Sequence, residues 1–328
     1  MPAMSAEPMD RRLLQATDWA RNMLGHDELS FEPVSGDASF RRYFRVFDGQ
    51  CSYVLMDAPP KQEDSRPFVE VAARLRAAGL RSPEIHHFDL ELGFGLIEDM
   101  GNQLYRSVID SRSALTLFPD LFDVLARMAR DVSADDLPAY DHELLQTELD
   151  LFTDWYLAHH KQYTLGDAAK SCWRELCKTL IQNAVTQPQV FVHRDFHSCN
   201  LMWEESRAPG IIDFQDAVRG PLSYDFISLI WDRYIHWPRA RVELWMKDMH
   251  SRLQPDFALS SWVRYCDLMG LQRNLKVAGI FARLHYRDGK QGYLEMIPRF
   301  YSYLLEVTAL YPEFAEFRSV LEEESCAP

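Results

Sequence analysis

The sequence predicts an α+β fold of two lobes: a small β-rich N-terminal lobe with one inserted helix, and a large helical C-terminal lobe. Two observations lead to this prediction. In the first hundred residues apolar side chains recur with a period near two, as in strands, whereas long amphipathic stretches of helical period fill most of the rest. A short polar run at 193–200, with apolar residues on both sides, interrupts the helical part. We place the boundary between the lobes near residue 100.

The first lobe is expected to be a small antiparallel sheet. A helix is predicted over residues 10–24, which are rich in Leu, Ala, Trp and Arg. Strands are predicted in FEPVS, FRRYFRVF and CSYVLMDA, with a turn at SGDAS, and again in EIHHFDL and GFGLIED. The stretch RPFVEVAARLRAAG lies between the two groups of strands and predicts a helix from about Pro67 to a stop at Gly79.

The second lobe is expected to be almost wholly helical. The amphipathic stretches that predict its helices lie near 113–132, 141–160, 168–186, 222–253, 258–284 and 293–324. Short strands are expected within 189–213, on either side of the polar run.

Composition limits the partners. A formal net charge of −14 disfavours a nucleic-acid backbone or an anionic membrane, because both would be repelled. No apolar run reaches the roughly 18 residues of a membrane span, and MPAMSAEPMDRRLLQ lacks the apolar core of a secretory signal. The six cysteines are scattered without a C-x-x-C pair, so we expect a reduced, cytoplasmic protein. Cys172 and Cys177 would need a second pair of ligands to form a metal site.

The polar run carries the chemistry. His193, Arg194, Asp195 and Asn200 match the protein-kinase catalytic loop H-R-D-x-x-x-x-N, and Asp213 ends an apolar strand thirteen residues after Asn200. Carboxylate and amide oxygens suit Mg²⁺, so Asn200 and Asp213 are candidate metal ligands beside a phosphate chain. Asp195 is the candidate base that orients the acceptor hydroxyl and takes its proton. Each residue alone could be a turn, cap or strand-end residue, but their order and spacing together favour a kinase.

This stretch resembles the aminoglycoside phosphotransferase family of protein-kinase-like small-molecule kinases. Their loop often reads H-G-D-x-H-x-x-N, followed by I-D-[FW]-x-[DE]; HRDFHSCN contains the second histidine, His197, and IIDFQD follows. The resemblance covers nearly the whole chain. It implies a protein-kinase-like bilobal fold with a nucleotide-binding lobe over 1–100 and a catalytic and substrate lobe over 101–328. It also implies ATP and Mg²⁺ as cofactors, His197 near the acceptor, and a loop-anchoring role for Asp225.

One departure from the kinase pattern concerns a missing lysine. In kinases the third strand carries a Lys that grips the α- and β-phosphates, but Met56 stands at that place here. The positive charge must then come from elsewhere. Arg41, Arg42 and Arg45 of the second strand are the candidates, although at least one of them is expected to face solvent.

A second departure is the phosphate loop. SGDASF has a single glycine, Gly36, so only backbone N–H groups and Ser39 remain to cap a phosphate. The segment LIEDMGN resembles the hinge of the family better, and it implies that the Glu98 carbonyl and the Met100 N–H meet the adenine edge.

Acceptor specificity is expected in the helical lobe. Trp231 could stack on a sugar, although an aromatic at helical spacing is more often a core residue. Arg273 and Lys276 belong to a polar-rich stretch, LQRNLKVAGIFARLHYRDGKQGYL, part of which must be solvated helix surface. This stretch, ASFRRYFRV and EDMG resemble bacterial kinases that phosphorylate the anomeric hydroxyl of N-acetylmuramate or N-acetylglucosamine in cell-wall recycling. The resemblance implies an N-acetylated amino-sugar substrate and transfer of the sugar 1-phosphate to a uridylyltransferase.

Three other functions stay open at this point. An aminoglycoside kinase would need an acidic site for its polycationic substrate, and the basic cluster at 273–290 speaks against it. A choline-type kinase would need an aromatic cage, for which tryptophans are present. A pseudokinase that binds nucleotide without transfer would explain the missing Lys, but not the intact Asp195, Asn200 and Asp213.

Overall fold

The computed structural model describes residues 10–34, 40–49 and 51–325, and the chain divides into two compact units. One unit comprises Met1–Gln103 together with Met202–Gln215, and the other comprises Leu104–Leu201 and Asp216–Pro328. The segment 202–215 thus belongs to the first unit although it lies far along the chain. The predicted α+β class is confirmed, with an antiparallel sheet in the first unit and mostly helices in the second.

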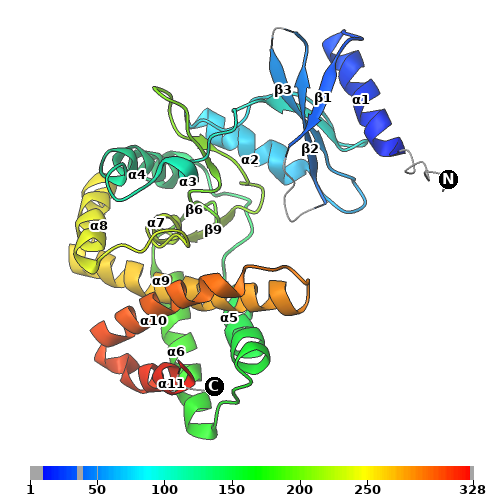
Figure 1. Ribbon diagram of the computed structural model, residues 1–328. Coiled ribbons are helices and arrows are strands. Elements are labelled where there is room, and N and C mark those ends of the chain that lie inside the picture. The colour runs from blue at the N-terminus through cyan, green and yellow to red at the C-terminus, as the bar shows by residue number, and fades with distance from the viewer. Residues whose placement is uncertain (1–9, 35–39, 50, 326–328) are drawn as a thin grey trace, which may run out of the picture. The chain divides into compact units, whose positions relative to one another are not determined.

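The first unit contains a five-stranded antiparallel sheet (Figure 1). In spatial order its strands are β1 (Ser30–Pro33), β2 (Arg42–Phe47), β3 (Ser52–Asp57), β5 (Phe94–Glu98) and β4 (Ile85–Asp89). Helix α1 (Arg11–Leu24) packs against the sheet, and its Ala16 and Ala20 share a core with Val46 and Leu55. These strands and this helix were all predicted, because the period-two alternation marks the sheet face that α1 covers.

Helix α2 (Arg66–Ala77) is the helix inserted between β3 and β4. Pro67 occupies its first turn, where a missing N–H costs nothing, and Gly79 follows its end with a φ of 70°. Both predicted limits are therefore confirmed. The Phe68 ring of α2 stacks on Phe214 of the segment 202–215, with 5.1 Å between ring centroids.

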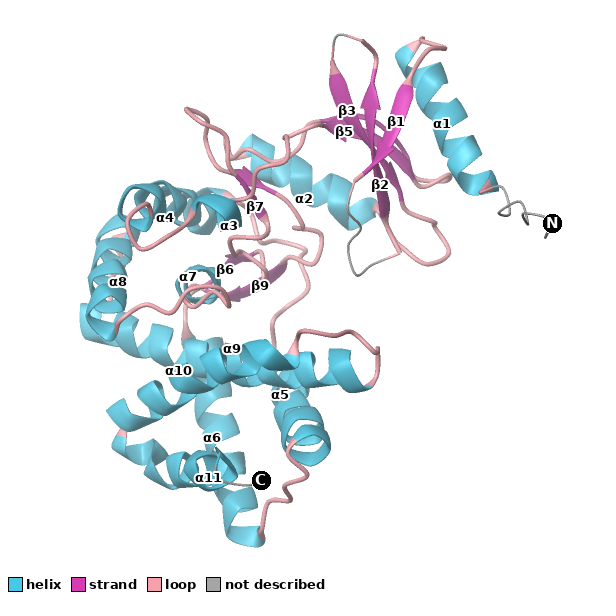
Figure 2. Ribbon diagram, viewed as in Figure 1, coloured by secondary structure: helices cyan, strands magenta, loops and turns pink. Residues whose placement is uncertain are grey.

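The second unit is built from helices, with two short strands among them (Figure 2). In chain order they are α3 (Tyr105–Val108), α4 (Ala114–Asp131), α5 (His142–Leu151), the π-helical segment η1 (Phe152–His160), α6 (Asp167–Thr186), α7 (Tyr224–Ile230), α8 (Arg239–Leu253), α9 (Leu259–Tyr286), α10 (Ile297–Leu310) and α11 (Ala315–Ser325), with short 3₁₀ turns η2 (Leu294–Met296) and η3 (Pro312–Phe314) beside α10. The long helix α9 packs against most of the others, including α5, η1, α7 and α10.

Glycines allow α9 to approach its neighbours closely. A Cβ at Gly279 would lie 2.3 Å from the backbone carbon of Leu151, and one at Gly270 would lie 1.6 Å from the Trp231 ring. Both distances are far shorter than any contact between real atoms, so only glycine permits this packing of α9.

Two stretches that were each predicted as one helix are divided into separate helices in the structure, so these two predictions are wrong. The stretch 222–253 is divided into α7 and α8, because Pro238 lacks an N–H and restricts the residue before it. The stretch 293–324 breaks in the same way at Pro312, between α10 and α11. The strands also extend beyond the predicted interval, since β9 (Val218–Pro221) pairs with β6 (Gln189–Val192).

Two further features of the described residues can be stated briefly. None of their helices is both long and apolar enough to span a membrane. The five cysteines in this part of the chain are all free thiols.

Candidate active site

The polar run folds as a tight loop after β6. Its second residue, Arg194, has a φ of 75°, a backbone conformation that residues other than glycine rarely adopt. The buried Asp225 carboxylate at the start of α7 accepts hydrogen bonds from the backbone N–H groups of His193 (2.6 Å) and Arg194 (3.0 Å). Burial raises the pKa of Asp225 to about 7, against the lowering effect of these two bonds. Asp225 thus anchors the loop, as the resemblance implied.

Hydrogen bonds within the loop fix its remaining residues. The Asp195 N–H donates to His193 Nδ1 at 3.3 Å, so the histidine ring holds the backbone of the loop. The Asn200 side-chain amide donates to the Asp195 carbonyl at 3.0 Å, and the Asn200 N–H donates to the His197 carbonyl at 2.9 Å. The Asp195 side chain itself is exposed. The loop therefore holds Asp195 and Asn200 in a set relative position.

A buried carboxylate, Glu148 of α5, ties this loop to α9. It lies 2.8 Å from the Arg194 guanidinium and 2.8 Å from Lys276 Nζ, and it also accepts from Gln272 (3.2 Å) and from the Tyr140 hydroxyl. Burial raises the pKa of Glu148, but Lys276 and Arg194 lower it more, so its net pKa is below the ordinary value. The sequence analysis missed Glu148, although a glutamate between two buried leucines of an amphipathic helix was an available signal.

A cavity of about 100 Å³ opens beside Asp195, entirely within the second unit. Its polar lining includes three cations, Arg233, Arg273 and Lys276, together with the carboxylates of Asp195 and Asp232. His197 and Tyr224 also line it, and four apolar side chains of α9 and α10 complete the wall. The structure therefore brings four predicted residues to one place: Asp195, His197, Arg273 and Lys276. Sequence reasoning missed Arg233 and Asp232.

The charges around this cavity are strongly coupled. Burial raises the pKa of Asp195. The nearby positive charges, above all that of Lys276, together lower it by more, so the net pKa of Asp195 lies below its ordinary value. Burial lowers the pKa of His197 to about 4, so this ring is neutral near pH 7. Its Nε2 lies 3.3 Å from Arg233 Nη2, and since the guanidinium can only donate, the ring accepts.

Trp231 lies in the core. Its side chain is 1% exposed and stacks on Tyr303, with 5.0 Å between ring centroids. It does not contribute to the lining of the cavity beside Asp195. The structure therefore shows Trp231 as a core residue, which was the alternative to sugar stacking in the sequence analysis.

The second candidate metal ligand, Asp213, follows β8 (Gly210–Ile211) in the first unit, whereas Asn200 belongs to the second. Asp213 has a φ of 62°, and its Oδ1 accepts a hydrogen bond from Gln215 at 2.8 Å. The next residue, Phe214, is fully buried against α2. Among the described residues, no group of three or more His, Cys, Asp or Glu side chains could hold a metal.

Arg41, which directly precedes β2, and the two arginines of β2 each pair with a carboxylate of the first unit. Arg41 lies 3.2 Å from Glu63, Arg42 pairs with both Asp57 and Asp10, and Arg45 pairs with Asp99. Met56 is fully buried in β3. Gly36 and Ser39 lie outside the described residues.

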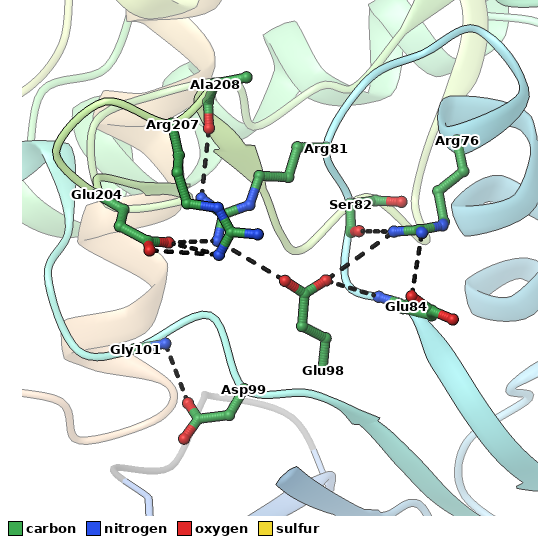
Figure 3. Close-up of polar contacts among 10 residues, drawn as sticks. All are labelled: Arg76, Arg81, Ser82, Glu84, Glu98, Asp99, Gly101, Glu204, Arg207 and Ala208. Atoms are coloured by element: carbon green, nitrogen blue, oxygen red, sulfur yellow. Dashed lines mark hydrogen bonds and ion pairs between the residues drawn. The ribbon is translucent and has the colours of Figure 1, made fainter. Parts of the chain in front are cut away.

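An ion-pair network surrounds the predicted hinge in the first unit (Figure 3). The Glu98 carboxylate accepts from the Glu84 N–H (3.2 Å) and lies 3.7 Å from Arg81, which reaches Glu204 at 2.7 Å. A Cβ at Gly210 would approach Met100 Cε to 2.4 Å. Glu98 and Met100 are therefore both held against elements of their own unit, including segment 202–215.

Comparisons with known proteins agree with this geometry. Residues 30–257 match the sequence model of the phosphotransferase enzyme family. An N-acetylmuramate/N-acetylglucosamine kinase of Pseudomonas putida is 43% identical over 329 residues, covering 96% of this chain and 97% of the relative. The enzyme with the same name in Pseudomonas aeruginosa is 46% identical over 294 residues, covering 88% of this chain and 87% of the relative.

Among solved structures, a choline kinase of Streptococcus pneumoniae superimposes with a TM-score of 0.65 at 14% identity, covering 91% of this chain and 99% of that one. At so low an identity this likeness shows the fold alone. The protein-kinase-like fold that was predicted is thereby confirmed.

Proposed function

The chain belongs to the phosphotransferase enzyme family, and we propose that the acceptor of its phosphate is the anomeric hydroxyl of N-acetylmuramate or N-acetylglucosamine. The two Pseudomonas relatives are named kinases of these sugars and match nearly the full chain. The observation that carries the proposal is the cavity beside Asp195, which joins an exposed carboxylate to cationic and apolar walls. Such a cavity suits an acceptor that carries hydroxyl, acetyl and acidic groups.

The charge of this cavity disfavours the alternatives. An aminoglycoside or choline is itself a cation, and the guanidinium groups of Arg233 and Arg273 on the wall of this cavity would repel it. The aromatic side chains there, Phe281, Phe300 and Tyr224, line only part of the wall and form no closed cage around a quaternary ammonium. A pseudokinase has no need of an acceptor cavity beside Asp195.

In the proposed reaction Asp195 orients the anomeric hydroxyl and accepts its proton as the phosphate arrives. This hydroxyl is more acidic than other sugar hydroxyls, so an ionised carboxylate of low pKa can assist with little proton transfer in the transition state. Asp225 and Glu148 act indirectly, because they hold the backbone and Arg194 of the loop on which Asp195 lies.

Mg²⁺ fits the residues that the motif provides. Asn200 and Asp213 offer hard oxygen donors, and Mg²⁺ in kinases typically takes one or two protein ligands with phosphate oxygens and water as the rest. The scarcity of other candidate ligands in the described part of the chain agrees with such a site. When bound, the ion would neutralise charge on the phosphates of ATP.

We assign ATP to the first unit. The Glu98 carbonyl and the Met100 N–H would meet the adenine edge, and the described residues offer the Met100 N–H no hydrogen-bond acceptor. Gly36, Ser39 and one of the three predicted arginines would contact the phosphates. In the cell we place the enzyme in the cytoplasm, where a uridylyltransferase would take up the sugar 1-phosphate.

Chemistry peculiar to position 1 of the sugar tests this proposal. The protein is given ATP, Mg²⁺ and N-acetylglucosamine, N-acetylmuramate or their methyl glycosides, in which the anomeric oxygen is blocked. The free sugars should yield an acid-labile, non-reducing phosphate detected by mass, and the glycosides should be inert. A phosphorylated glycoside, or a product that survives mild acid, contradicts the anomeric assignment. No product from either free sugar contradicts the choice of substrate.

A further inference from the structure

The three cations of the cavity differ in what they bind. Lys276 is committed within the protein, since its Nζ lies 2.8 Å from Glu148 and donates to the Tyr224 hydroxyl at 3.0 Å. Burial lowers the pKa of Lys276, but Glu148, together with Tyr224 and Asp195, raises it to a net value above the ordinary one. Its charge therefore balances a buried carboxylate and is not available to a ligand.

Arg273 is the opposite case. Its side chain is only 5% exposed, yet across the described residues its guanidinium makes neither a hydrogen bond nor an ion pair. It lines the cavity together with Asp195. The charges of Asp195 and Asp225 act on this guanidinium, but an arginine so far removed from water is costly without a hydrogen bond or ion pair of its own, and a bound anion would supply one.

Arg233 lies on the same cavity and has no carboxylate within ion-pair distance among the described residues. Its guanidinium lies 5.3 Å from the ring centroid of Tyr234 and 5.8 Å from that of Phe281, and it donates to the neutral His197 ring. These contacts orient the planar group without neutralising it. Two guanidinium groups that form no ion pair with any described residue thus face one small cavity, together with the carboxylates of Asp195 and Asp232.

We propose that Arg273, with Arg233, forms a carboxylate subsite that binds the lactyl group of N-acetylmuramate and so sets the preference for this sugar over N-acetylglucosamine. The inference rests on the proposed function. The two sugars differ only in the lactyl ether, which adds one carboxylate and one methyl group. A planar guanidinium matches a carboxylate through two parallel hydrogen bonds. The apolar wall, which includes Ile280 and Phe281, would receive the methyl group.

Arg273→Gln separates this inference from a general role in phosphate transfer. With ATP saturating, kcat/KM for N-acetylmuramate should fall roughly 10- to 100-fold, the effect of losing a hydrogen bond to a charged group. The value for N-acetylglucosamine should change far less, so that the ratio between the sugars shifts at least about tenfold. Equal losses on both sugars, or a rise in the KM for ATP, would mean that Arg273 serves the transferred phosphate, and would overturn the subsite.

A change in the substrate makes the test independent of any variant. The methyl ester of N-acetylmuramate removes the charge of the lactyl group and adds one methyl group, and the wild-type protein should use it about as poorly as Arg273→Gln uses the acid. Ester and acid of equal kcat/KM would overturn the inference. Arg287→Gln is the matched control, because Arg287 is exposed, pairs with Asp288 and lies outside the cavity; it should retain the wild-type ratio.

The two proposals fail in different ways. If the wild-type protein phosphorylates neither sugar, the proposed function is wrong and the subsite falls with it. If both sugars are phosphorylated but neither Arg273→Gln nor the ester alters their ratio, the function stands and only the subsite is wrong.

Discussion

Arg194 donates from its guanidinium Nη2 to Glu148 Oε1 at 2.8 Å, so a buried carboxylate of α5 holds the residue that precedes Asp195, the proposed base. Arg194 has a φ of 75°, which favours glycine, and related kinases often carry glycine at this place in the loop. The ion pair, and the Tyr140 ring 5.8 Å from the guanidinium, help to offset this backbone strain.

Glu148→Gln should weaken both the fold and the reaction. The change leaves Arg194 and Lys276 buried without their carboxylate, which typically costs about 3–5 kcal/mol in the free energy of unfolding. Because Arg194 is then released, Asp195 should lose its position and kcat should fall. Urea denaturation and steady-state kinetics measure the two effects. Glu143→Gln, an exposed change on the same helix, should alter the free energy of unfolding by less than about 1 kcal/mol. Equal stability of the two variants would rule out the anchoring role.

Asp195→Asn should lower turnover by roughly 10²–10⁴-fold while nucleotide affinity stays unchanged, since the amide keeps the shape of the side chain but cannot take a proton. Turnover is measured by coupled assay and affinity by calorimetry. Asp256→Asn makes the same chemical change at an exposed site and should keep full activity. If Asp195→Asn kept more than about a tenth of the rate, another group would be the base.

Much of this arrangement could be predicted from the sequence because it is local. Alternation of apolar residues marks the strands of the sheet, and a proline and a glycine mark the limits of α2. The catalytic loop is a short motif whose order can be read directly. The anchoring role of Asp225 was implied by the resemblance to the aminoglycoside phosphotransferase family.

The remaining parts depend on contacts between distant residues. Glu148 precedes Arg194 by 46 positions and Gln272 by 124, and no periodicity links them. Asp232 and Arg233 were missed for a different reason. They lie in the irregular segment between α7 and α8, which the amphipathic pattern presents as one helix, so their side chains could not be assigned to a cavity.

Of the three predicted arginines, Arg41, which directly precedes β2 and lies 3.2 Å from Glu63, is the one expected to serve the phosphates in place of the missing Lys. Arg45 binds Asp99 through two nitrogens at 2.7 and 2.9 Å, and Arg42 is similarly held by Asp57, so both act within the fold. Arg41→Ala should raise the KM for ATP severalfold with little change in the KM for sugar. Arg45→Ala should instead lower the melting temperature. A normal KM for ATP in Arg41→Ala would leave metal and backbone as the only phosphate contacts.

Trp231 should affect stability and not sugar binding. Trp231→Ala removes a fully buried ring and should cost about 3–5 kcal/mol in unfolding free energy. Trp231→Phe, which keeps most of the packing, should leave the KM of both sugars unchanged. Gly270→Ala should destabilise the fold as well, because its Cβ would overlap the Trp231 ring. A stable Trp231→Phe variant with a raised sugar KM would restore the sugar-stacking interpretation.

His197 should make the fold sensitive to mild acid. Burial lowers its pKa in the folded state to about 4, from an ordinary value of 6.5, while Asp232, Arg233, Asp195 and Arg273 add opposing charges around the ring. Between these two pH values the unfolded chain binds the proton and the folded chain does not, so stability is present above pH 6.5 and is lost as the pH falls toward 4. The loss attributable to this group reaches about 3 kcal/mol.

Urea denaturation of wild type and His197→Gln at several pH values between 4 and 7 isolates this contribution. Glutamine does not titrate, so the difference in unfolding free energy between the two proteins should change by up to about 3 kcal/mol across the interval, with wild type losing more stability toward acid. Parallel curves for wild type and His197→Gln would mean that the folded and unfolded states bind this proton equally well. The neutral ring accepting from Arg233 would then be the wrong description of the site.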